Sequence, residues 1–248
     1  MINISKKFRD RKCSLSKEVY DSNYLTSSGA ITRSNEALEE EQLENILKQS
    51  EFSLPISVKK FYQQVTELSL NWEIVNERHR NGIEREAIFK RDIWIKQNLL
   101  DKDYSWEAVR ILLSGSLNIP EFKNLIDIEF IKATGMYAAA TKVGLTAGSL
   151  LPLDTNEFAI ACMKHEDGEL IDNIYLYTGF GEFPVKLHDM GITFEKYLDL
   201  AYKAKCFNYW NLVYCLRDKA PNYELMKRFF PVIFPHIEPD LEEFGITY

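Results

Sequence analysis

The sequence predicts an α+β domain in which an antiparallel-rich sheet is flanked by helices. Between Phe158 and Leu187, a short continuous apolar run is followed by segments in which apolar and polar residues alternate, as in neighbouring strands joined by turns. From Gly191 the apolar spacing becomes that of a helix, and helical spacing also occurs earlier, near Glu36 and after Ser57. Strands and helices are therefore expected in separate runs, which is typical of the α+β class.

The length of 248 residues fits one large domain or two small ones. No apolar run approaches the roughly 20 residues that span a bilayer. The first residues are basic but lack the apolar segment of a signal peptide. We therefore expect a soluble, cytoplasmic protein.

The chain has four cysteines, and none of them forms a C-x-x-C pair. In a protein inside the cell they are expected to be reduced and mostly buried. Cys162 and His165 form a C-x-x-H sequence, but without a second ligand pair coincidence explains it better than zinc. We therefore expect neither a metal nor a cofactor.

The charge is unevenly distributed along the chain. Residues 1–20 hold six Lys or Arg against two acids and so carry a charge of +4. Because the net charge of the whole chain is −7, the remaining residues carry −11. An acidic body disfavours nucleic acid and anionic membranes and suits a basic protein partner, although solubility alone is the simpler explanation of such a composition. Residues 1–28 lack a periodic apolar face, and we expect them to form a basic mobile arm.

The first helix is expected in the segment "SNEALEEEQLENILKQS". Ser34 or Asn35 can cap it, and glutamates fill its first turns, where the helix dipole favours negative charge. Its apolar stripe consists of Leu43, Ile46 and Leu47.

A second helix is expected to begin at Pro55, a residue well suited to a first helical position. Its apolar positions are Val58, Phe61, Tyr62 and Val65. The segment from Leu68 to Ile74 then alternates like a half-buried strand, with Leu68, Leu70 and Trp72 on one side.

The centre of the chain has weaker patterns. Residues 75–114 read as helical or mixed, and a strand is expected near Leu117 to Ile119. Residues 123–156 give little basis for an assignment. The small residues and glycines of "TGMYAAATKVGLTAG" match neither a dinucleotide-binding fingerprint nor a P-loop, so we do not predict a cofactor loop there.

Beyond this region the strands are clearer. The pattern sharpens at "LLPLD", the run from Phe158 to Met163 predicts a strand, and Asp167-Gly168 predicts a turn into a second strand, "LIDNIYLYT". The alternation of Phe183, Val185 and Leu187 predicts a last strand at the edge of the sheet, where Pro184 is tolerated.

The segment "GITFEKYLDLAYKAKCFNYW" predicts an amphipathic helix that packs on the sheet. Thr193 is a natural N-cap residue, and Ile192 and Tyr197 occupy the two positions of a hydrophobic staple. One face consists of apolar and aromatic residues and the other of charged ones. We expect the aromatic face in the core and the charged face in water. The apolar face comprises Phe194, Tyr197, Leu198, Ala201 and Tyr202, and the charged face comprises Glu195, Lys196, Asp199 and Lys203.

This helix, directly after an antiparallel meander, resembles the C-terminal part of the SUKH superfamily, which is named for a yeast cell-wall assembly regulator and is widespread in bacteria. "SLPISVKKFYQQVTELSLNWEI", "GSLNIPEF" and "LLPLD" resemble earlier family segments in the same order. One departure is Thr66-Glu67, where the family has Asn-Gly, so that turn must be built differently. The residues that carry the resemblance are Leu54, Pro55, Phe61, Tyr62, Trp72, Asp154, Phe194, Tyr197 and Trp210.

The resemblance implies a single SUKH-like domain over residues 29–220, with an insertion near residues 75–114 and an acidic C-terminal extension over residues 221–248. Bacterial members of the family are typically immunity proteins, which neutralise toxin domains, often nucleases, by stoichiometric binding. The resemblance therefore implies a non-enzymatic protein with a cognate, basic toxin domain as its partner.

Two acidic clusters are candidates for that interface. For any single residue a solvated face or turn is the simpler explanation, but we expect one of the clusters to take part in binding. The first cluster comprises Glu39, Glu40, Glu41 and Glu44, and the second comprises Glu157, Glu166, Asp167 and Glu169.

Two other functions stay open. Eukaryotic relatives suggest a regulatory or scaffolding module that has no toxin partner, and a neighbouring toxin gene would distinguish the two. For an enzyme we find no catalytic motif: the four histidines lie in unlike settings, and Asp154 with Glu157 is a common carboxylate spacing. We therefore predict no catalytic residues.

Overall fold

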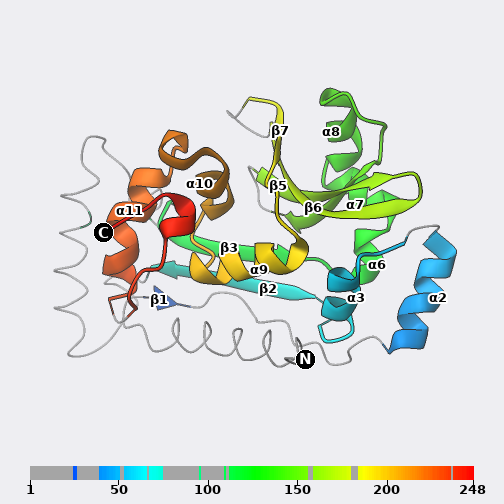
Figure 1. Ribbon diagram of the computed structural model, residues 1–248, viewed down its shortest axis with the longest axis horizontal. Helices are drawn as coiled ribbons and strands as arrows, with labels where there is room; N and C mark the ends of the chain where they lie inside the picture. The colour runs from blue at the N-terminus through cyan, green and yellow to red at the C-terminus, as the bar shows by residue number, and fades with distance from the viewer. Residues whose placement is uncertain are drawn as a thin grey trace.

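Over the residues that it describes, the computed structural model of this protein has two antiparallel sheets, and helices cover them (Figure 1). This arrangement confirms the predicted α+β class. The structure describes residues 25–26, 39–50, 53–65, 67–74, 95, 109, 112–155, 159–179, 184–235 and 237–248.

The smaller sheet has the order β1-β2-β3 and the larger one the order β4-β5-β6-β7, with antiparallel pairing throughout. The two sheets meet where β3 lies against β4. The bounds of the strands are Leu25–Thr26 (β1), Leu68–Ile74 (β2), Ser114–Ile119 (β3), Leu150–Thr155 (β4), Ala159–Glu166 (β5), Glu169–Thr178 (β6) and Lys186–Asp189 (β7).

Helices α2 and α3 precede the first long strand, three short helices connect the two sheets, and the last three helices follow β7 (Figure 1). Their bounds are Glu40–Ser50 (α2), Ile56–Tyr62 (α3), Phe122–Leu125 (α6), Ile128–Ala133 (α7), Met136–Lys142 (α8), Phe194–Lys203 (α9), Trp210–Leu216 (α10) and Tyr223–Ile233 (α11).

Most elements with a clear pattern form where they were expected. Strand β2 has the predicted bounds and alternation, and Thr193 caps α9 by accepting a hydrogen bond from the Lys196 amide at 3.4 Å. Asp167 and Gly168 form the predicted turn with φ values of 50° and 83°, a left-handed conformation that glycine adopts without strain. Helix α2 begins at Glu40, and its predicted caps Ser34 and Asn35 lie outside the described residues.

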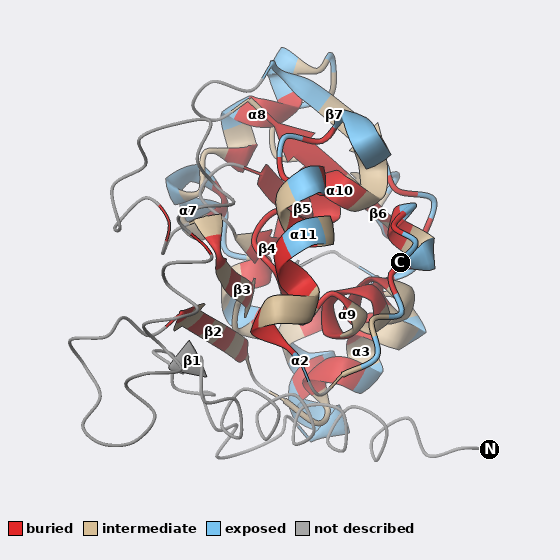
Figure 2. Ribbon diagram, turned by 90° about the vertical axis from the view of Figure 1, so that its left-hand side faces the viewer, coloured by how far each residue is buried: buried red, intermediate tan, exposed pale blue. Residues whose placement is uncertain are grey.

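The last predicted strand is wrong in its position. Strand β7 begins at Lys186, so Val185, which was expected within the strand, lies before it and is 48% exposed. Pro184 has no amide hydrogen for the ladder, and the Thr178 hydroxyl donates instead to the Pro184 carbonyl at 2.8 Å. Phe183 lies outside the described residues. In Figure 2 the short edge strand β7 is pale blue and tan, with no buried residue, whereas β4 and the first part of β5 are buried.

Trp72 is at the centre of the core beside the smaller sheet. Its indole Nε1 donates to the Lys205 carbonyl at 2.6 Å, and its ring meets Phe207 and Phe234 edge to face. Gly115 lies opposite Trp72 across the strand pair, and a Cβ there would be 2.1 Å from Nε1. The strand pair therefore admits this indole only because its partner position has no side chain.

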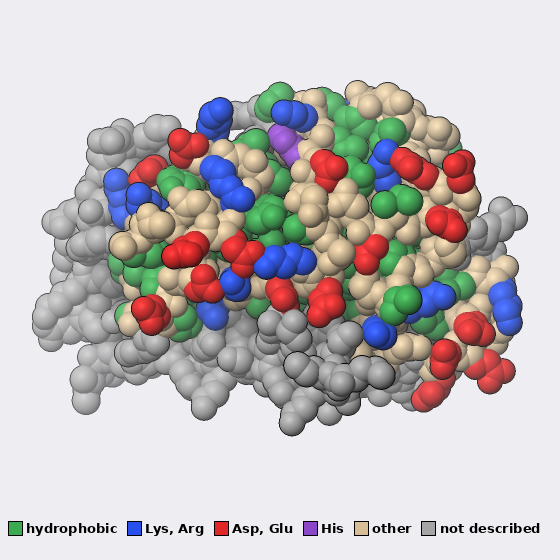
Figure 3. Space-filling model, in the orientation of Figure 1, with side chains coloured by type: hydrophobic (Ala, Val, Ile, Leu, Met, Phe, Trp, Pro, Cys, Tyr) green, Lys and Arg blue, Asp and Glu red, His purple; other side chains and the backbone are tan. Residues whose placement is uncertain are grey.

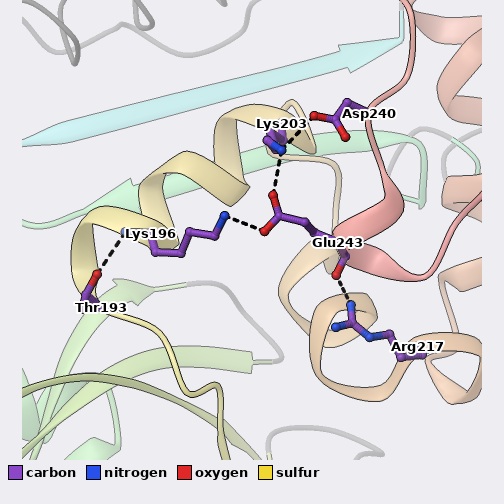
Figure 4. A network of polar contacts seen from close by, with 6 residues as sticks. All are labelled: Thr193, Lys196, Lys203, Arg217, Asp240 and Glu243. Carbon is purple, nitrogen blue, oxygen red and sulfur yellow. Dashed lines mark hydrogen bonds and ion pairs between the residues drawn. The ribbon is translucent and has the colours of Figure 1, made fainter.

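The charged face of α9 is covered in part by the end of the chain (Figure 4). Lys196 pairs with Glu243 at 2.5 Å, and Lys203 pairs with Glu243 at 2.7 Å and with Asp240 at 2.8 Å. The Arg217 guanidinium donates to the Glu243 carbonyl. The expectation that this face lies in water therefore needs correction: its lysines are half-buried beneath the C-terminal segment.

The segment expected to be an acidic extension, residues 221–248, packs into the same core as the residues before it. Phe244 is fully buried and meets Trp210 at 6.2 Å between ring centroids. The Tyr223 hydroxyl donates to the Gly245 carbonyl at 2.6 Å. Helix α11 contributes Phe229 and Phe230 to this core.

Two predicted segments fall largely outside the described residues. Of the basic arm, the structure describes Leu25 and Thr26, which pair with Ile74 and Glu73 of β2. Of the insertion near residues 75–114, it describes Ile95, Val109 and residues 112–114. The prediction that the arm is mobile stays a prediction.

Candidate protein-binding surface

The first acidic cluster lies on the exposed side of α2. Leu43 and Leu47 of this helix are buried, so the glutamates between and before them point outward. The Gln42 side-chain carbonyl accepts the Glu39 amide at 2.9 Å and fixes the start of the helix. The exposed acids are Glu39, Glu40, Glu41 and Glu44.

The second cluster lies at the tip of the hairpin formed by β5 and β6. Glu166, Asp167 and Glu169 are exposed around the turn. Lys164 pairs with Glu166, and its ammonium lies 5.7 Å from the centroid of the Tyr175 ring. Glu157, the remaining predicted member, lies outside the described residues.

Ser53 joins the two clusters although they are far apart in sequence. It lies between α2 and α3, its amide donates to the Gly168 carbonyl at 3.2 Å, and its carbonyl accepts the Leu170 amide at 3.1 Å. The tip of the hairpin is thus bonded to the linker that follows α2. Figure 3 shows acidic side chains over both elements at the same end of the molecule. We call this surface the acidic end; it comprises Glu39, Glu40, Glu41, Glu44, Glu166, Asp167 and Glu169.

A second contact fixes α3 beside the same hairpin. The carboxylate of Asp172 accepts the Ser57 hydroxyl at 3.0 Å and the Phe194 amide, in the first turn of α9, at 3.1 Å. A register shift between β5 and β6 lies beside Asp172, and such bulges re-aim side chains. Ile56, next to Ser57, is 69% exposed. An apolar side chain is therefore held at the surface close to the acidic hairpin.

A groove of about 500 Å³ lies on the other side of the hairpin, between its tip and the loop from α8 to β4. Glu166 and Asp167 form part of one wall, and the His165 amide donates to the Ser149 carbonyl at 2.8 Å across its base. The acidic end therefore combines protruding charge with a concave region.

The acidic end carries a net negative charge. The cations on the same two elements are Lys48 and Lys164, and Lys164 is paired with Glu166. Positive charges on a partner would meet exposed carboxylates at this surface. The lysines of α9 lie elsewhere and are paired with acids of the C-terminal segment.

The residues that carry the family resemblance lie in the core and not at the acidic end. All are buried except Pro55, which is half-buried. Asp154 is the polar one among them: it accepts the Asn118 amide at 2.8 Å and the Tyr197 hydroxyl at 2.7 Å. Burial raises the pKa of its carboxyl to about 6, and the two hydrogen bonds lower it by less than burial raises it. These residues therefore maintain the fold.

The described part of the chain assembles no metal centre, since no three of its His, Cys, Asp and Glu side chains gather as ligands. Cys162 is buried, its thiol bonds the Tyr175 carbonyl at 3.5 Å, and burial raises the pKa of that thiol. A raised pKa disfavours the reactive thiolate. None of the helices that the structure describes is both long and apolar enough to span a bilayer.

Sequence reasoning found the acidic residues but missed what brings them together. Ser53, Asp172 and Ile56 had no distinguishing local signal, because a serine or an aspartate that bonds a distant segment looks like any polar surface residue. Only the register of the hairpin against the linker identifies them.

No family model, no curated protein and no solved structure matches this chain. The resemblance to the SUKH superfamily therefore stays a prediction that depends on the order of the quoted motifs.

Proposed function

We propose that this protein is a non-enzymatic binding protein, an immunity protein that neutralises a cognate, basic toxin domain by occluding it. Two considerations support the proposal: the SUKH-like order of motifs, and the acidic end. The observation that carries it is the pair of hydrogen bonds at Ser53, which places the α2 cluster and the hairpin cluster at one end of the molecule.

Occlusion of a basic toxin domain requires fast and specific binding. Exposed carboxylates on one surface attract a cationic partner before contact and accelerate association, and they discriminate against acidic partners. Ile56 supplies an apolar contact beside the charges, and interfaces commonly combine an apolar centre with a polar rim. The groove beside the hairpin offers a place for a protruding side chain.

The test begins with co-expression of this protein with each toxin-like gene near its own locus. The expected result is that cells survive one of these toxins, that about one copy per toxin is enough, and that the toxin domain co-purifies. If no toxin is neutralised and none co-purifies, the immunity hypothesis fails, and the regulatory-module hypothesis takes its place.

The surface is then tested by charge reversal. Glu166→Lys with Asp167→Lys should slow association with the toxin domain at least about 10-fold at low salt, because electrostatic steering changes association rates 10-fold or more. The difference should shrink as salt rises and screening shortens to about 8 Å. Stopped-flow mixing measures the rate.

The matched control is Asp218→Lys with Glu224→Lys, which makes the same change in net charge on exposed residues in the turn after α10 and in the first turn of α11, at the opposite end of the molecule (Figure 1). Equal slowing by both double variants would mean that net charge alone matters and that the acidic end is not the interface. Circular dichroism checks that both variants fold.

A further inference from the structure

Asp154 lies where three elements of the fold meet. It is 1% exposed and belongs to β4 of the larger sheet, directly after a register shift that follows Pro152. Its Oδ1 accepts the Asn118 amide of β3, in the smaller sheet, and its Oδ2 accepts the Tyr197 hydroxyl of α9. One carboxyl thus links both sheets and the helix that covers them.

Among the described residues, the titratable groups that interact with this carboxyl are Tyr197 and Cys206. Both are buried, and burial is the largest cause that raises the pKa of each, so both are neutral at physiological pH. Lys205 acts on the pKa of Cys206, but no described cation affects the pKa of Asp154. The other polar neighbour, Asn211, bonds Tyr197 and carries no charge.

The two protonation forms of Asp154 therefore differ in cost. When it is ionised, both oxygens accept hydrogen bonds, but a full negative charge lies in the core without a cation, which is unfavourable. When it is neutral, no buried charge remains, but the carboxyl proton and the Tyr197 hydroxyl hydrogen cannot both lie in the 2.7 Å contact between Oδ2 and the Tyr197 oxygen, so this form gives up one hydrogen bond.

We propose that Asp154 makes the junction of the two sheets proton-sensitive, so that the fold tightens when this carboxyl binds a proton and loosens when it loses one. This inference concerns a buried group and is independent of the proposed binding function.

The direction of the effect follows from the burial of this carboxyl without a neighbouring cation, and its pKa agrees with that direction. The pKa of Asp154 rises from 3.8 to about 6 in the folded protein. A group with a raised folded pKa contributes its full stabilisation below its unfolded pKa, and that contribution is lost as pH rises through the folded pKa. Each pKa unit corresponds to a tenfold change in the folding equilibrium, so between pH 4 and pH 7 Asp154 weakens folding by roughly 100-fold.

The first experiment compares wild type with Asp154→Asn in urea unfolding from pH 4 to pH 8. The amide keeps an oxygen for the Asn118 amide but does not titrate. The folding equilibrium constant of wild type, divided by that of the variant, should fall roughly 100-fold over this range. Asp167→Asn, which removes an exposed carboxyl, should run close to wild type. A ratio for Asp154→Asn that does not change with pH would overturn the proposal.

A second measurement does not depend on whether Asp154→Asn folds. In wild type, carbon-13 NMR of the Asp154 carboxyl should show a transition near pH 6 instead of near 3.8. In Tyr197→Phe the transition should move to a higher pH, because the Tyr197 hydroxyl lowers the pKa of this carboxyl. A carboxyl that titrates near pH 4 in wild type, or that is unaffected by Tyr197→Phe, would contradict the assigned role.

Discussion

Trp72 shows how much a single side chain can require of its neighbours. Its ring is fully buried, its indole nitrogen needs the Lys205 carbonyl, and its volume needs the space above Gly115. The alternation of residues in the sequence predicted that Trp72 lies on the apolar side of its strand. The need for a residue without a side chain at position 115 depends on the register between β2 and β3. Gly115 is therefore required for space, not for a turn.

At Gly115 we predict that an added methyl group is costly. Gly115→Ala places a Cβ within 2.1 Å of the Trp72 indole, a clash that the indole's hydrogen bond prevents it from avoiding. Overpacking of this kind should destabilise the protein by about 1–3 kcal/mol in urea unfolding. In a double-mutant cycle, Gly115→Ala should cost less in a Trp72→Phe background than in wild type. Additive effects would show that the two residues do not compete for this space.

At the scale of elements, the sequence predicted those helices and strands that are long enough for their apolar residues to repeat regularly. Helix α9 was recognised because its buried face repeats every three to four residues and Thr193 marks its start. Helices α6, α7 and α8 contain four, six and seven residues, too few for a repeat to show, and residues 123–156 accordingly could not be assigned. The acidic residues of the candidate surface were identified by composition, but the Ser53 contact that unites them spans more than 100 positions of sequence and had no local signal.

The C-terminal segment stabilises the fold mainly through its apolar residues. Phe244 is fully buried against Trp210, and Phe244→Ala should cost about 3–5 kcal/mol in chemical unfolding. Glu243→Gln weakens the ion pairs with Lys196 and Lys203, which water partly screens, and it should cost under about 1 kcal/mol. Raising the salt concentration should reduce the difference between Glu243→Gln and wild type but leave the cost of Phe244→Ala unchanged. If the glutamine variant is the less stable of the two, the ion pairs dominate and this ranking is wrong.

At the scale of the whole molecule, contacts between distant segments determine what each end presents. The acidic end is assembled by Ser53 between α2 and the hairpin, and away from this end the C-terminal segment covers part of α9. The charge of the surface and the stability of the core therefore depend on different segments. This separation permits the surface to be altered without unfolding the protein.

Ser53→Pro tests the assembly of the acidic end. Proline has no amide hydrogen to donate to the Gly168 carbonyl, so the linker should detach from the hairpin while the sheets persist. Hydrogen exchange should show faster exchange at Leu170, whose amide bonds the Ser53 carbonyl, and little change in β2 and β3. Toxin association should slow as the two clusters lose their fixed spacing. Ser53→Ala, which keeps the backbone amide, is the control and should behave as wild type in both assays.

The late position of Phe244 in the sequence has a consequence for biosynthesis. Trp210 and the aromatic face of α9 emerge from the ribosome before the residue that completes their packing, and synthesis from Trp210 to Phe244 takes about 2–7 s at ordinary elongation rates. During that interval the nascent chain exposes apolar surface that chaperones can bind. Messages interrupted before Phe244 would yield chains that cannot close this core, and the cell's proteases would remove them. The newly made protein can therefore complete this part of its core only after Phe244 has been synthesised.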